Sequence, residues 1–290
     1  MTGFLKAFAV AVLLAAGASG CVVVRKGVEA MTAPFADNLT KSLQKESDLQ
    51  LVKDAVPAYL LLLDALVESS PDSARVLLAA ADAQTAYATA FVDKAEAARA
   101  ADMYAKARDY GLRVLCRNRK FRKVHDQPLD RFETALPSFR KRDVPALYTT
   151  ATAWSGWIIS KSDSMAALAE LSKAMALMKR VYQLDPGYQH GGPDMFFGIY
   201  YAVQPRGGGQ DLQKSKEHFE RAFLYAGDDL QLPRVAYAEF YARYAFDREL
   251  FEKTLKGVTE HKTSQPSLTL MNEVARKRAE VLLEKADELF

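Results

Sequence analysis

The sequence predicts an all-α fold of stacked antiparallel helix pairs, a compact α-solenoid. Three observations lead to this prediction. Nearly every segment after about residue 45 repeats apolar residues at the three-and-four spacing of one helix face, and almost none alternates as a strand does. Short polar turns separate these segments. Alanine is abundant on the apolar faces, and small residues at helix crossings allow close packing.

The first three helices are expected at residues 55–68, 74–92 and 94–116. Turn residues at 69–73 separate the first two, and Pro71 suits the first turn of the second. The residues expected to face inward in the first helix are Tyr59, Leu62, Leu63 and Leu66.

The second half starts with a predicted helix at 165–183 that ends before Pro186. Further helices are expected at 234–246, 249–261 and 267–290. The stripe expected to be buried on the 165–183 helix consists of Leu168, Leu171, Met175, Met178 and Tyr182.

Residues 113–143 form a less regular middle with ten basic and four acidic side chains. Prolines at 128, 137 and 145 interrupt helix continuity. Two interpretations stay open for this stretch. It is either a contact for acidic lipid or an acidic partner, or a solvated connection between helical halves at about 46–125 and 145–290.

The N-terminus has the outline of a secretory signal peptide, with one lysine, a short apolar run and small residues before Cys21. The small residues and Cys21 resemble the lipobox of bacterial lipoproteins, in which the cysteine carries the acyl chains that anchor the protein. Val22, where aspartate would resemble an inner-membrane retention signal, favours the outer membrane. This divides the chain into a leader (1–20), a lipidated cysteine with its tether or first helix (21–45) and a single helical-repeat domain (46–290). A soluble secreted protein is the alternative.

Charge and composition exclude several functions. The net charge is +3, or +2 once the leader with its Lys6 is removed, which argues against nucleic acid as a partner. Cys116 is left without a disulfide partner if Cys21 is lipidated. The four histidines are too scattered to suggest a metal site, and no catalytic or cofactor motif is present. We therefore expect a protein that is not an enzyme and carries no metal or cofactor.

One helix pair resembles a tetratricopeptide repeat. Gly198 and Tyr201 lie three apart on its first helix, and Ser215, Phe219 and Ala222 follow the repeat's small-x-x-x-Phe-x-x-Ala order on the second. The connection between the two helices is longer than in the repeat, and its extra residues fall at 204–211. Insertions of this kind map to one face of a stack, often the binding face.

Four longer stretches resemble the T component of tripartite ATP-independent periplasmic (TRAP) transporters. They are VPAYLLLLDALVESSPDSARVLLAAADAQTAYATAFV, ALYTTATAWSGWI, PRGGGQDLQKSKEHFERAF and RVAYAEFYARYAFDRELFEKTL. The resemblance implies a lipoprotein that partners a periplasmic solute-binding protein and self-associates, with a trimer as one form. It also implies an apolar passage for a hydrophobic or organic-acid ligand. A helical-repeat scaffold for envelope assembly is the alternative function.

Three groups of residues are candidates for binding a ligand or partner. Trp154 and Trp157 share a helix face and suit either an apolar passage or the core. The glycine-rich stretch suits an anion cradle or a flexible turn, and Asp211 after it suits a helix N-cap. Tyrosines with polar tips suit either a channel wall or the edge of the core. The members of the last two groups are Arg206, Gly207, Gly208, Tyr200, Tyr201, Tyr237 and Tyr241.

Overall fold

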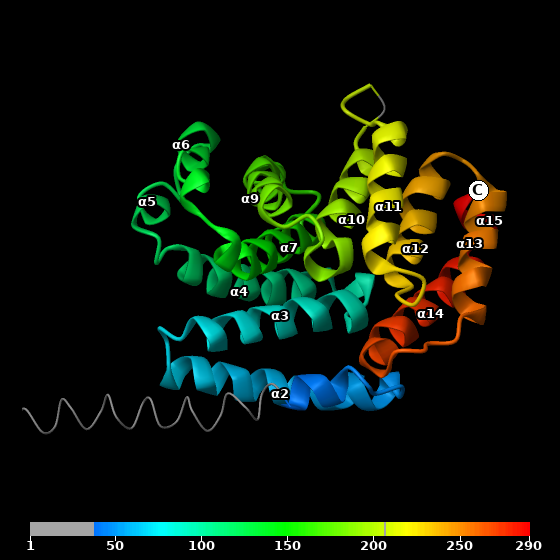
Figure 1. Cartoon of the computed structure of the whole chain (residues 1–290), viewed down its shortest axis with the longest axis horizontal. Coiled ribbons are helices and arrows are strands. Elements are labelled where there is room, and N and C mark those ends of the chain that lie inside the picture. Colours follow the sequence, from blue (N-terminus) through cyan, green and yellow to red (C-terminus); the bar gives the residue numbers. More distant parts are fainter. Residues whose placement is uncertain (1–37, 206) are drawn as a thin grey trace, which may run out of the picture.

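The structure is a computed structural model that describes residues 38–205 and 207–290. Every regular element in these ranges is helical, which confirms the predicted all-α class (Figure 1). The leader, Cys21 and Arg206 lie outside the described residues. None of the described helices combines the length and the apolar character needed to cross a bilayer.

The N-terminal part is built on four long helices. α2 packs on α3, α3 on α4, and α4 on α7, which also touches α3 (Figure 1). Asp48 begins α2 by accepting hydrogen bonds from the Gln50 and Leu51 backbone N–H groups, at 2.9 and 3.0 Å. The bounds of these helices are Leu49–Ser69 for α2, Ala74–Phe91 for α3, Ala97–Leu115 for α4 and Val144–Ser160 for α7.

The buried face of α2 differs from the predicted one at Leu62, whereas Leu63 is buried and Tyr59 and Leu66 pack against the core as predicted. Val56, Leu60, Leu63 and Val67 point inward, whereas Leu62 is 44% exposed. Four consecutive leucines at 60–63 make the helical stripe ambiguous, because the sequence alone fits more than one rotation of the helix. The neighbouring helix supplies the surface that selects one of them.

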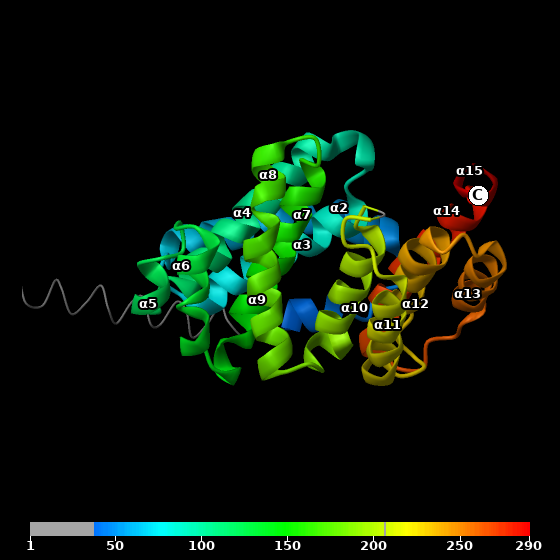
Figure 2. The same cartoon turned by 90° about the horizontal axis from the view of Figure 1, so that it is seen from above.

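Two elements replace the single helix predicted at 165–183. α8 (Met165–Ala169) and α9 (Leu171–Leu184) meet at Glu170. Figure 2 shows the two helices following one another from above. The Lys173 N–H donates to the Glu170 carbonyl at 3.0 Å, an i to i−3 bond that marks a tight turn. Leu168 is therefore 40% exposed and does not join the stripe.

The middle stretch consists of short ordered pieces between α4 and α7. These are α5 (Arg119–Arg122), α6 (Leu129–Glu133) and 3₁₀ turns at Leu136–Ser138 and Lys141–Asp143. They share one apolar core with α7, α9 and α10, so the core runs continuously through the middle of the chain.

The C-terminal part opens with the pair α10 and α11. Phe219 of α11 is completely buried against Gly198 of α10, and the Ser215 hydroxyl donates to the Gly198 carbonyl at 2.7 Å. The residues that resemble the repeat motif therefore contact one another across the pair. The bounds are Tyr188–Val203 for α10, Leu212–Ala226 for α11, Leu232–Ala236 for α12, Tyr237–Ala242 for the π-helix η4, Arg248–Glu260 for α13, Thr269–Glu284 for α14 and Ala286–Leu289 for α15.

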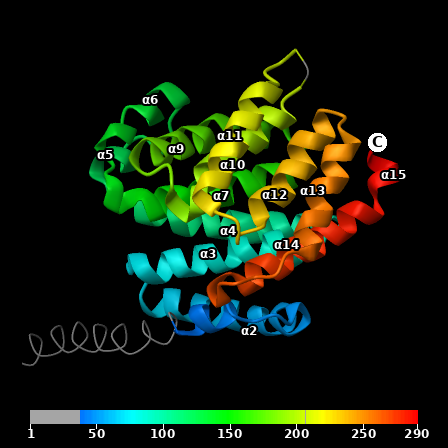
Figure 3. The same cartoon turned by 45° about the vertical axis from the view of Figure 1, so that its right-hand side comes forward.

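The last long helix returns to the first. α14 contacts α2, and Figure 3 shows it directly above α2. The Leu270 N–H donates to the Gln44 carbonyl at 3.0 Å. Leu270 also packs on the apolar cluster that contains Val52 and Val56.

Candidate functional site

The two tryptophans lie in different environments. Trp154 is 3% exposed and packs edge to face on Phe132, with ring centroids 6.3 Å apart. Trp157 is half-buried, and the Arg108 guanidinium lies 4.5 Å from its ring centroid. Trp154 therefore packs in the core, and the binding roles predicted for both tryptophans stay predictions.

One of the two tyrosines at the end of α10 stacks on a histidine of α11. Tyr201 stacks on His218 with ring centroids 5.5 Å apart, and Tyr200 packs edge to face on Tyr201. His218 Nδ1 lies 2.7 Å from the fully buried Asp194 carboxylate, which also accepts from Arg221 Nε at 3.0 Å. Because this histidine has a buried carboxylate partner, its role in the described structure is to connect α10 and α11.

Tyr237 and Tyr241 belong to the π-helix η4. Their rings stack with centroids 4.7 Å apart, and Tyr237 also packs edge to face on Phe219. Burial raises the pKa of the Tyr237 hydroxyl to about 12. These two tyrosines lie at the edge of the α10–α11 core. π-helical turns occur often at functional sites.

The glycine-rich loop is tied to the end of α10. The Asp211 N–H donates to the Tyr201 carbonyl at 3.0 Å. The Asp211 carboxylate accepts from the Lys214 N–H at 2.9 Å, which confirms the predicted N-cap and lowers the pKa of that carboxyl. Gly207 has φ +78°, a left-handed conformation that favours glycine. Gly208 does not have a positive φ.

A pocket of about 400 Å³ lies beside this loop. α10 and the loop contribute one wall, and the chain after η4 and the end of α15 contribute the others. We call it the C-terminal pocket. Sequence reasoning found the loop but missed the residues opposite, because nothing in the sequence places 243–246 beside 203–210. Its lining residues outside the loop are Val203, Arg243, Tyr244, Phe246 and Leu289.

The middle stretch carries exposed positive charge on a fixed base. Phe121, Phe132 and Phe139 pack together, with ring centroids 5.1 Å apart for the first two and 5.3 Å for Phe121 and Phe139. The Arg180 guanidinium donates to the Phe139 carbonyl at 2.7 Å and ties this base to α9. Seven exposed basic residues flank the three phenylalanines, and we call them the basic platform: Arg117, Arg119, Lys120, Arg122, Lys123, Arg131 and Arg140.

The charges of the basic platform are not paired with acidic side chains in the described structure. None of its seven side chains forms an ion pair with an acidic group in the described parts of the chain; only the neighbouring Lys141 and Arg142 do, with Asp185 and Asp143. An ordered surface with unpaired positive charge attracts acidic groups. The contacts of the phenylalanines show that this connection between the helical halves is ordered, and its role as a contact for acidic lipid or an acidic partner stays a prediction.

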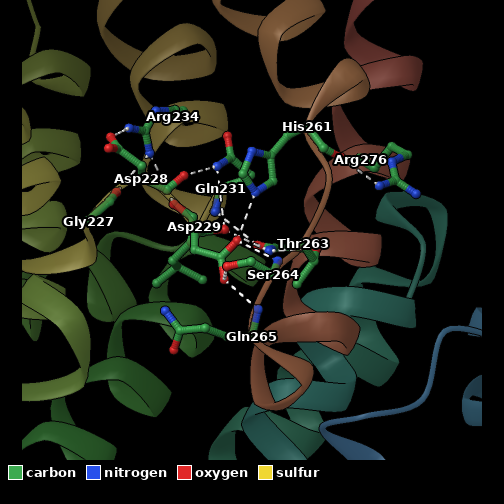
Figure 4. A network of polar contacts seen from close by, with 12 residues as sticks. Gly227, Asp228, Asp229, Gln231, Arg234, His261, Thr263, Ser264, Gln265 and Arg276 are labelled. Atoms are coloured by element: carbon green, nitrogen blue, oxygen red, sulfur yellow. Dashed lines mark hydrogen bonds and ion pairs between the residues drawn. The ribbon is translucent and has the colours of Figure 1, made fainter.

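A second polar network joins the α11–α12 turn to the chain before α14 (Figure 4). The Asp229 carboxylate accepts hydrogen bonds from the Ser264 and Gln265 backbone N–H groups, at 2.9 and 2.7 Å. The same carboxylate also accepts a hydrogen bond from the Ser264 hydroxyl at 3.0 Å, and His261 Nε2 lies 3.1 Å from it. The Ser264 N–H makes the largest contribution in lowering the pKa of Asp229 to about 2.

This network predicts an acid-sensitive stability. Because the pKa of Asp229 is lower in the folded chain than its ordinary value near 3.9, ionised Asp229 stabilises the fold above about pH 4. That contribution is lost as pH falls toward about 2. Melting temperatures measured between pH 5 and 2 should fall less steeply for Asp229→Asn than for the parent protein. Parallel curves would contradict this assignment.

Asp82 on α3 is a further polar group that the sequence did not point to. The Thr149 hydroxyl of α7 donates to it at 2.5 Å. Asp82 is exposed to solvent, and partial desolvation by the surrounding protein raises the pKa of its carboxyl above the ordinary value. No group of three or more acidic, histidine or cysteine side chains in the described ranges is arranged to hold a metal ion.

Comparison with known proteins identifies the family. The family described as TRAP transporter T-component matches residues 45–290. An uncharacterized protein of Treponema pallidum (strain Nichols) is 24% identical over 302 residues, which cover 94% of this chain and 94% of that protein. The match to the family takes in nearly all described helices, the C-terminal pocket and the basic platform. The chain therefore belongs to the TRAP transporter T-component family and is an accessory component of this class of transporter.

Proposed function

We propose that this chain is a periplasm-facing lipoprotein that holds the solute-binding protein of its transporter at the outer membrane and binds a small ligand. Cys21 would carry the lipid anchor after removal of residues 1–20. Membership of the T-component family supports a role in solute uptake. The docking surface for the solute-binding protein is the basic platform, and the partner presents an acidic face to it.

The observation that carries the docking proposal is the unpaired charge of the basic platform on a rigid base. Lys120 and Arg122 flank the buried Phe121 directly, and Arg131 and Arg140 flank Phe132 and Phe139 in the same way. Because the aromatic contacts fix these backbone positions, the charges are presented at a set spacing. A charged surface that is ordered before binding costs less to dock than a flexible tail.

Arginine dominates the platform, which favours a protein partner with carboxylates. The guanidinium group donates two parallel hydrogen bonds to one carboxylate, which a lysine ammonium does not. Complementary charge of this kind raises the association rate and makes binding dependent on salt.

The test is direct binding of the purified solute-binding protein to the mature chain. Lys120→Glu/Arg122→Glu/Lys123→Glu should weaken binding about tenfold or more at low ionic strength, because three attractive charges become repulsive. A control with the same net charge is Lys53→Glu/Lys253→Glu/Lys262→Glu, whose exposed lysines lie outside the platform. Its affinity should stay within about twofold of the parent, and added salt should weaken parent binding.

Three results would overturn the proposal in different ways. Equal weakening by both triple variants would show that only net charge matters and that the platform is not the docking surface. A parent protein that binds no solute-binding protein would remove the transport role and leave the scaffold alternative. Binding of the parent to vesicles of anionic lipid, without binding to the protein partner, would assign the platform to the membrane surface instead.

A further inference from the structure

The C-terminal pocket combines an apolar wall with the guanidinium of Arg243, the one cationic group among its described lining residues. Val203, Pro205 and Leu289 form part of the wall, and Arg243 and Phe246 reach it from the chain after η4. Its volume of about 400 Å³ lies within the range of small-molecule sites. Among the described residues that line it, none is an aspartate or a glutamate.

Arg243 has no acidic partner in the described parts of the chain. It is half-buried, and its guanidinium lies 5.9 Å from the Tyr244 ring centroid. Other arginines of the C-terminal part are paired: Arg248 with Glu252 and Asp287, and Arg278 with Glu239. A partly desolvated guanidinium without a carboxylate has the chemistry to bind an anion from solution.

Phe246 stands in a conformation that costs the fold stability. Its φ is +56°, in the left-handed region that disfavours side chains other than glycine, asparagine and aspartate. The side chain is 65% exposed, so burial does little to offset this strain. Strained residues of this kind cluster at ligand sites, where the surrounding structure holds them in place.

The surroundings hold both residues in fixed positions. The Phe246 N–H donates to the Arg243 carbonyl at 3.1 Å, and the Asp247 N–H donates to the Ala242 carbonyl at 3.0 Å. On the other side, the Gln210 amide donates to the Ala202 carbonyl at 2.9 Å and ties the loop wall to α10. The pocket is therefore bounded on both sides by hydrogen-bonded turns.

We propose that the C-terminal pocket binds a small amphipathic organic anion, with its carboxylate on Arg243 and its apolar body against Phe246 and Leu289. This inference deepens the ligand-binding part of the proposed function and rests on it. The arginine fixes the charged end of the ligand, and the apolar wall selects for an aromatic or aliphatic body. Ligands without the anionic group leave Arg243 without its partner and bind more weakly.

Isothermal titration of the mature chain with phenylacetate, 4-phenylbutyrate and 6-phenylhexanoate tests this directly. The carboxylates should bind, and 4-phenylbutyramide, their neutral counterpart, should bind at least about tenfold more weakly. Arg243→Gln should weaken the carboxylates by a similar factor and leave the amide nearly unchanged. Arg119→Gln, an exposed arginine of the basic platform, is the matched control and should change neither affinity.

Phe246→Gly separates binding from folding. Glycine adopts the left-handed conformation freely, so the melting temperature should rise or stay equal while the affinity for 4-phenylbutyrate falls several-fold. Leu224→Ala removes an exposed apolar side chain from α11, far in sequence from the residues that line the pocket, and should not change the affinity.

Three outcomes would overturn the inference. They are no binding of any of the three carboxylates, equal binding of carboxylate and amide, and unchanged affinity in Arg243→Gln. These measurements use the chain without its protein partner. Failure here with intact docking of the solute-binding protein rejects only the ligand site, and failure of docking with intact ligand binding rejects only the platform.

Discussion

Replacing Phe219 with alanine is expected to lower the free energy of unfolding by about 3–5 kcal/mol, the usual cost of emptying a buried phenylalanine site. Phe219 is completely buried, and its ring covers Gly198 on α10 and packs on Tyr237 of η4 at 5.5 Å. The change therefore leaves a cavity where three helical elements meet. Chemical denaturation followed by circular dichroism measures the loss.

A control from the same helix isolates burial from helix propensity. Leu224 lies on α11 and is 83% exposed, so Leu224→Ala should change the free energy of unfolding by less than about 0.5 kcal/mol. If Phe219→Ala cost no more than this control, the α10–α11 contact would not be a main source of stability.

Gly111→Ala is expected to destabilise the fold by about 1–3 kcal/mol, the cost of overpacking a tight contact. A Cβ atom at this position would lie 2.2 Å from the Thr150 hydroxyl oxygen and 3.2 Å from the Thr150 Cα. The backbone atom cannot move without shifting α7 against α4. Thermal and chemical denaturation of the purified variant measure the effect.

Two comparisons test the cause of that loss. Gly257 on α13 has nothing within 4 Å of a Cβ atom, so Gly257→Ala should stabilise the chain by about 0.5–1 kcal/mol through helix propensity. Adding Thr150→Ala to Gly111→Ala removes the nearest clashing oxygen and should recover part of the stability. A Gly111→Ala variant as stable as Gly257→Ala would contradict the close α4–α7 packing.

Helix period and turn residues were enough to predict the fold class and most helices. The order of Gly198, Ser215 and Phe219 also predicted contacts that the structure contains. The rotation of α2 about its axis was harder to predict, because the leucine run 60–63 fits more than one buried face. The helix predicted at 165–183 was broken at Glu170, although residues 165–183 contain no proline or glycine to signal a break.

The candidate site was only half visible in the sequence. Glycines at 207–209 pointed to the loop, because glycine is the residue that a left-handed turn requires. Arg243 and Phe246 gave no such signal: a positive φ at phenylalanine has no signature in the sequence, and the missing partner of an arginine is a property of tertiary contacts. The positive charge of the basic stretch was evident from the sequence, but the packing of its three phenylalanines on one another was not.

The hydrogen bond between Gln44 and Leu270 has a consequence for how the molecule comes apart. Stacked helices that touch only their neighbours fray from their ends, and each end opens on its own. Here Leu270 packs on the apolar cluster of α2, so opening either end exposes apolar surface at both. Amide hydrogens of α2 and α14 should therefore exchange at similar rates. A mechanical pull on the chain N-terminal to Gln44 would load α14 as well as α2.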